Sequence, residues 1–110
     1  MAYDEELAER IRVLVAGEPG LAEKKMFGGL AFLIGGNMAV AASGQGGLLV
    51  HVDTDESDAL LASTSARPFE MRGRAMRGWL RVASEDLASD DELAGWVGRG
   101  TAYARSLPPK

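Results

Sequence analysis

Arginines crowd one short stretch of the sequence and make it the most strongly charged segment of the chain. The stretch contains Arg67, Arg72, Arg74, Arg77 and Arg81. Glu70 is the one acidic residue among them, although the whole chain carries a net charge of −4. Guanidinium groups bind phosphates and carboxylates in a bidentate manner, so this segment is the first candidate for a binding site.

An indole accompanies the arginines in what should be the last strand. The alternation of a strand predicts that Arg77, Trp79 and Arg81 share one face, with Gly78 and Leu80 on the other. Such a face suits stacking on a base, an aromatic ligand or a partner protein. A dimer surface, a plain solvated face and an anion or nucleic-acid site all remain open. The tentative binding residues are Arg72, Arg74, Arg77, Trp79 and Arg81.

His51 is the single histidine, and it lies in an apolar strand beside Leu49. One histidine followed by Asp53 does not make a metal site, and no serine lies in the G-x-S-x-G pattern of a hydrolase. The sequence therefore predicts no catalytic residue, no metal and no cofactor. A small-ligand site or an enzyme centred on His51 is the weaker alternative.

The stretch "KKMFGG" at residues 24–29 places lysines and glycines together, as phosphate-binding loops do. A P-loop, however, needs its lysine after the glycines, and a dinucleotide fingerprint needs a helix to follow. Here Lys24 and Lys25 precede Gly28 and Gly29, and more strand follows. We expect the two glycines to let the strand bend or let a neighbouring backbone approach closely.

Composition excludes several classes of function. The 110 residues contain no cysteine, which excludes disulfides, zinc–thiolate sites and cysteine nucleophiles. No apolar run approaches the roughly 18 residues of a membrane span, and the acidic N-terminus is unlike a signal peptide. With 46% hydrophobic and 25% charged residues, the chain is expected to be one cytoplasmic domain spanning residues 1–110.

The pattern along the chain predicts an α+β fold. Helical spacing over residues 4–20 is followed by a three-stranded antiparallel meander at residues 30–34, 38–43 and 48–53. A short helix at 54–63, two strands within 66–82 and a helix over 89–107 complete the order. We expect Asp4, Asp53 or Thr54, and Ser89 to cap the helices. Apolar residues on both strand faces suggest that both sides of the sheet are covered, one by helices and the other by a partner subunit.

The stretches "KKMFGGLAFLIGGNMAVAA", "GGLLVHVD" and "RPFEMRGRAMRGWLRV" resemble the N-terminal domain of the TfoX/Sxy family. The signature of that family corresponds to Lys25, Met26, Phe27, Gly28 and Gly29. The resemblance implies a secretion-chaperone-like α+β fold in which the sheet commonly supports dimerisation. It also implies regulation of natural competence together with a transcription factor, and no enzymatic activity. Those regulators carry a second, helical domain, whereas this chain ends after the first.

These observations lead us to expect a non-enzymatic binding or regulatory domain that acts through protein partners as a homodimer. The first alternative is a nucleic-acid-associated regulator using the segment from Arg67 to Arg81, which the negative net charge does not favour. No membrane partner is expected.

Overall fold

The computed structural model describes residues 3–26, 28–71 and 73–109, and of Met71 the backbone alone. Their elements, in chain order, are α1 (Glu5–Val15), β1 (Leu21–Met26), β2 (Gly29–Ile34), β3 (Asn37–Ala42), β4 (Leu48–His51), α2 (Thr54–Ser63), β5 (Arg67–Met71), β6 (Arg74–Val82), the 3₁₀ turn η1 (Ser84–Leu87) and α3 (Asp90–Ser106). The predicted α+β class and the order of helices and strands are confirmed.

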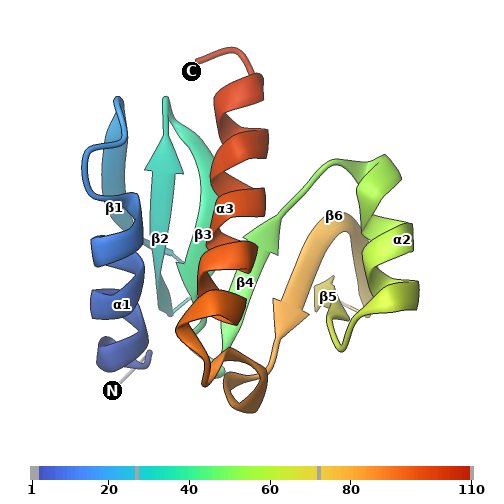
Figure 1. Ribbon diagram of the computed structural model, residues 1–110. Helices are drawn as coiled ribbons and strands as arrows, with labels where there is room; N and C mark the ends of the chain where they lie inside the picture. Colours follow the sequence, from blue (N-terminus) through green and yellow to red (C-terminus); the bar gives the residue numbers. More distant parts are fainter. Residues whose placement is uncertain (1–2, 27, 72, 110) are drawn as a thin grey trace.

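The six strands formed by the described residues make one antiparallel sheet in the order β1-β2-β3-β4-β6-β5. The first four strands follow one another as a meander. After β4 the chain runs through α2 to the far edge, where β5 forms before β6 returns beside β4 (Figure 1). Consequently β4 and β6 are spatial neighbours although a helix and a strand separate them in the sequence.

Strand β1 adds one strand before the three that the apolar alternation predicts. Its four central residues, Ala22 to Lys25, are exposed, so this edge strand shows no alternation of buried and exposed positions. It is held by its pairing with β2, in which Lys24 faces Ala31 and Met26 faces Gly29. Backbone pairing of this kind leaves no hydrophobic periodicity in the sequence.

Each of the three α-helices begins at a side-chain cap that the sequence predicts. The carboxylate of Asp4 accepts a hydrogen bond from the Leu7 N–H at 3.2 Å, and that of Asp53 accepts from the Asp55 N–H at 2.8 Å. At the start of α3, the Ser89 hydroxyl accepts from the Glu92 N–H at 3.3 Å. These bonds satisfy N–H groups that would otherwise lack a partner in the first turn.

The main core lies between the sheet and helices α1 and α3. Its most completely buried large side chains are Phe32, Ile11, Leu48, Leu80, Leu87, Leu93, Val15, Val40, Val50, Val52 and Val82. Helix α3 runs close to β3 because Gly100 lacks a side chain: a Cβ there would lie 2.4 Å from the carbonyl oxygen of Ala39. Helix propensity disfavours all three glycines of α3, Gly95, Gly98 and Gly100, but a close approach to the sheet requires a glycine at Gly100 alone among them.

The segment after α3 returns to the start of β3. The side-chain amide of Asn37, which is 5% exposed, donates a hydrogen bond of 2.9 Å to the carbonyl oxygen of Pro108. Pro109 packs near Gly35 in the turn between β2 and β3. The end of the chain therefore lies beside this turn, as Figure 1 shows at the top of the molecule.

Candidate functional site

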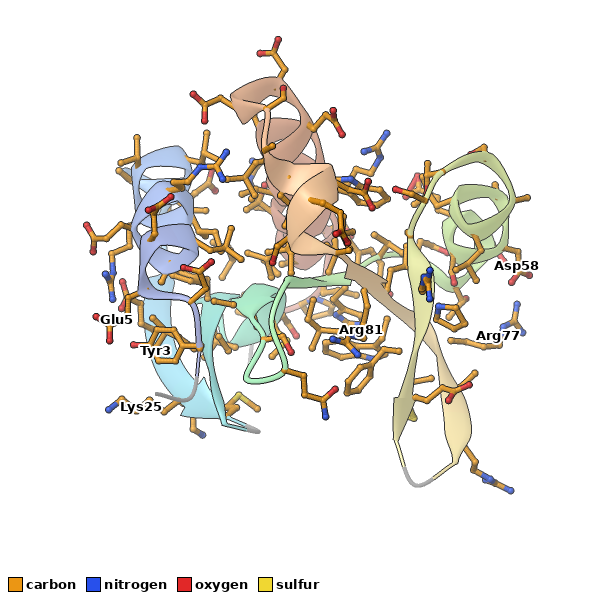
Figure 2. The ribbon with its side chains drawn as sticks, turned by 90° about the horizontal axis from the view of Figure 1, so that it is seen from below. Tyr3, Glu5, Lys25, Asp58, Arg77 and Arg81 are labelled. Atoms are coloured by element: carbon orange, nitrogen blue, oxygen red, sulfur yellow. The ribbon has the colours of Figure 1, made fainter. Side chains whose placement is uncertain are left out.

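Helices α1, α2 and α3 lie on one side of the sheet, and no helix of the described residues covers the other side (Figure 2). We call this other side the helix-free face. It is apolar at its centre. Its buried and half-buried members are Ala31, Met38, Ala41, Leu49, Met26, Leu33, Phe69 and Trp79. The sequence predicts apolar residues on both faces, and the geometry places them there.

The register of the strands shows how charge is arranged on the helix-free face. Directly paired residues share a face of the sheet, so one row of side chains can be followed from edge to edge. That row reads Lys24, Ala31, Ala41, Leu49, Arg81 and Arg67. Small apolar side chains thus occupy the middle, with a cation at the β1 edge and two arginines at the β5 edge.

A groove of about 270 Å³ opens on the same face. Its apolar walls come from Met26, Met38, Leu49 and Phe69, and Glu70 supplies one carboxylate. Ligand pockets for drug-sized molecules commonly enclose about 300–1,000 Å³. This groove is slightly smaller than that range.

An aromatic cluster lies where β4 diverges from β3. The rings of His51 and Trp79, which are cross-strand partners, stack with centroids 3.9 Å apart and planes 10° from parallel. The ring of Tyr103 from α3 meets the His51 ring edge-on at 5.0 Å. The Nδ1 atom of His51 lies 3.2 Å from the carbonyl oxygen of Met38, so it donates to that oxygen in the Nδ1–H tautomer. These contacts give His51 a packing role between the two strands.

Two of the arginines predicted as binding residues, Arg77 and Arg81, have different partners. The Arg81 guanidinium donates to the side-chain oxygen of Gln45 at 3.1 Å and to the carbonyl oxygen of Gly46 at 3.3 Å. That of Arg77 pairs instead with Asp58 of α2 at 3.3 Å. In Figure 2 the two side chains lie apart, Arg81 below the middle of the sheet and Arg77 beside α2.

The alternation that should have aligned these residues is broken inside β6. Gly78 has φ +86°, a value that side chains with a Cβ rarely adopt, and its carbonyl oxygen accepts a hydrogen bond from the Val52 N–H at 2.8 Å. Trp79 stays on the helix-free face beside His51, and Arg74 is exposed on β6. Arg72 lies outside the described residues.

The family signature serves the turn between β1 and β2. Lys25 and Met26 end β1, Gly28 adopts φ +77° in the turn, and Gly29 begins β2. A Cβ on Gly29 would lie 2.2 Å from the carbonyl oxygen of Ala42, so the β3 backbone can approach because no side chain is present. Phe27 lies outside the described residues. Gly29 therefore allows the close approach expected from the sequence, whereas Gly28 lies in a turn between two strands and not at a bend within one strand.

The described residues contain neither a metal-binding cluster nor a membrane-spanning helix. No group of three or more His, Cys, Asp or Glu side chains within them is placed to hold a metal ion. None of their helices has the length and apolar character needed to cross a membrane. The apolar side chains on the helix-free face make that face the candidate functional surface.

Comparison with known proteins identifies the family. No curated protein sequence matches the chain significantly. The sequence model of the TfoX N-terminal domain matches residues 14–104, which include every strand of the sheet and nearly all of α3. The chain belongs to the TfoX N-terminal domain family.

Proposed function

We propose that this chain is a non-enzymatic regulatory domain that acts through protein partners and works as a homodimer, with the helix-free face as the dimer interface. The observation that carries the proposal is the set of half-buried apolar side chains on that face, which includes Leu33, Phe69 and Trp79. Contiguous apolar surface without a covering layer is typical of protein–protein interfaces. No helix of the described structure lies over this face, and Leu33, Phe69 and Trp79 are only half-buried there, although neighbouring side chains already bury Ala31 and Leu49.

A second copy is the occupant best supported for this face. The family resemblance implies that the sheet commonly supports dimerisation. A two-fold interface also brings identical surfaces together, so the half-buried apolar side chains of this face would meet their copies while the charged ends of the row remain at the rim. The half-buried Trp79 and Phe69 are of the types enriched in the centres of interfaces.

Sedimentation velocity at micromolar concentration tests the dimer. We expect the wild-type chain to sediment with twice the mass of one chain. Leu33→Glu should yield monomers, because Leu33 is half-buried on the helix-free face and a carboxylate there would lose its hydration in the interface.

The matched control is Val13→Glu, which places the same charge at an apolar position on α1 that is 76% exposed. This variant should remain dimeric, and circular dichroism should show that both variants keep the fold. A wild-type chain that is monomeric at every concentration, or equal dissociation by both variants, would contradict the proposed interface.

A further inference from the structure

A second surface, outside the apolar centre of the helix-free face, places two arginines side by side. Arg67 of β5 and Arg81 of β6 are directly opposite in the antiparallel register, so their side chains leave the same face of the sheet. Directly paired side chains have their Cβ atoms about 4.5–5.5 Å apart, and like charges in that arrangement destabilise a sheet. The pairing therefore has an electrostatic cost in the absence of a counter-ion.

No ion pair within the described residues joins a carboxylate to either of these two arginines. Four described arginines form an ion pair with Asp or Glu, whereas Arg67 and Arg81, like Arg74 and Arg99, form none. Arg81 is held by two uncharged acceptors on the turn at residues 43–47. This holds its guanidinium in place without neutralising it. The contrast is notable because acidic residues outnumber basic ones by 16 to 12.

A pocket of about 340 Å³ lies at the pair. It is lined by Arg67, Pro68, Arg81, Val82, Ala83 and Glu85. The volume falls in the usual range for small-molecule sites. Two guanidiniums and one carboxylate leave it with one net positive charge, and the carboxylate provides an acceptor for a hydrogen-bond donor on a ligand.

We propose that this pocket binds a small phosphate monoester that also carries an amine or hydroxyl group. The phosphate would lie between Arg67 and Arg81, which can each donate two hydrogen bonds to it. The donor group of the ligand would face Glu85. A phosphate near −2 with one ammonium group balances the charge of the pocket, whereas a polyanion would be repelled by Glu85. The inference concerns a ligand and does not depend on the homodimer.

Isothermal titration calorimetry in a phosphate-free buffer of low ionic strength tests the site, with 2-aminoethyl phosphate as the probe. We expect saturable binding to the wild-type chain, weakened at least about tenfold by Arg67→Gln or Arg81→Gln. The matched control is Arg74→Gln, which removes an exposed arginine of the same hairpin that does not line the pocket. This variant should bind within about twofold of wild type, because a distant exposed charge contributes little.

Glu85→Gln tests the second half of the site. This variant should bind inorganic phosphate more tightly than wild type does and should lose the preference for 2-aminoethyl phosphate over inorganic phosphate. Equal affinity of the wild-type chain for the two probes would overturn the role given to Glu85.

The absence of saturation below about 10 mM of either probe, or an equal loss of affinity in Arg74→Gln, would overturn the site itself. Binding of duplex DNA without binding of the small probes would assign the arginines to a nucleic-acid surface instead.

Thermal unfolding shows whether a variant that fails to bind the probe is still folded. Without ligand, Arg67→Gln should unfold at or above the wild-type midpoint, because the repulsion between the paired arginines is removed. Addition of 2-aminoethyl phosphate should raise the midpoint of the wild-type chain but not that of the variant, since a ligand stabilises the folded state that it binds. A wild-type midpoint that the probe does not move would contradict the proposal.

Discussion

Single glycines decide how closely the layers of this protein pack. Gly100 in α3 is buried against β3, and a Cβ there would also lie 2.8 Å from Cγ1 of Val40. At Gly98, one half-turn earlier, a Cβ would meet no described atom within 4 Å apart from its chain neighbours and the nearby backbone of its own helix. Both positions are glycines in the same helix, so alanine should gain the same helix propensity at each. Any difference between the two variants then reports the effect of packing against β3.

We predict opposite effects of alanine at these two glycines. Gly100→Ala should lower the free energy of unfolding by about 1–3 kcal/mol, because the new methyl group forces α3 away from the β3 backbone. Gly98→Ala should raise it by up to about 1 kcal/mol through helix propensity. Urea denaturation of the two variants measures both. Equal shifts in the same direction would show that propensity alone governs this helix.

Features that depend on a few neighbouring residues could be predicted from the sequence. The caps at Asp4, Asp53 and Ser89 depend on a few neighbouring residues, and all three are confirmed. The partner of Trp79 could not be found in this way. Its indole stacks on His51, a residue of β4 that becomes its neighbour through the return of β6 beside β4.

At the scale of elements, an ion pair joins α1 to the edge strand β1. The Arg12 guanidinium donates to both carboxylate oxygens of Glu23, with Nε–Oε2 at 2.8 Å and Nη2–Oε1 at 3.0 Å. Glu9 on α1 also contacts Arg12. Hydrogen bonding from Arg12 lowers the pKa of the Glu23 carboxyl below its ordinary value of 4.5, although partial burial opposes the effect.

This lowered pKa makes the contribution of the pair depend on pH. A carboxyl whose pKa is lower in the folded than in the unfolded state stabilises the fold above the unfolded value, and that contribution is lost as pH falls through the folded value. We therefore expect Glu23→Gln to unfold at a lower temperature than wild type at pH 7. The difference should shrink as the pH drops below 4.5.

Thermal unfolding across this pH range measures the effect, with Asp58→Asn as the comparison. Asp58 meets Arg77 through a single contact of 3.3 Å, and both side chains are largely exposed. Its replacement should change the midpoint less at pH 7. A gap between wild type and Glu23→Gln that persists at low pH would assign the effect to packing instead of charge.

The elements themselves were predictable where one face is buried. Helix α1 and strands β2 to β4 contribute buried apolar residues, and their periodicity indicates each of them. Strand β1 was not indicated because it is polar and gains its place through pairing with β2. The prediction that Arg77, Trp79 and Arg81 share a face requires side chains to alternate regularly along β6. Gly78, which has a positive φ, interrupts that alternation.

The molecule as a whole is unevenly packed. Helices α1 and α3 bury long apolar stripes against β2, β3 and β4, whereas the one buried residue of α2 is Ser57. Leu60 and Leu61 of α2 are half-buried at the edge of the main core. In Figure 1, α2 stands with β5 and β6 on the right, apart from α1 and α3.

We predict that hydrogen exchange will follow this unevenness. Backbone amides of α3 should exchange slowly, at a rate set by global unfolding, while those of α2 should exchange faster through local opening. Hydrogen–deuterium exchange with mass spectrometry resolves the two helices. Equal protection of α2 and α3 would show that the molecule opens as one cooperative unit.

The contact between Asn37 and Pro108 has a practical consequence for anyone who engineers this protein. The buried amide of Asn37 finds its acceptor in a carbonyl seventy-one residues along the chain, past the last turn of α3. Truncation after residue 107 would remove that acceptor and leave a polar group unsatisfied inside the protein, and a tag joined there would replace the two prolines whose backbone holds the carbonyl in place. Fusions should therefore retain Pro108 and Pro109 and begin their linker beyond them.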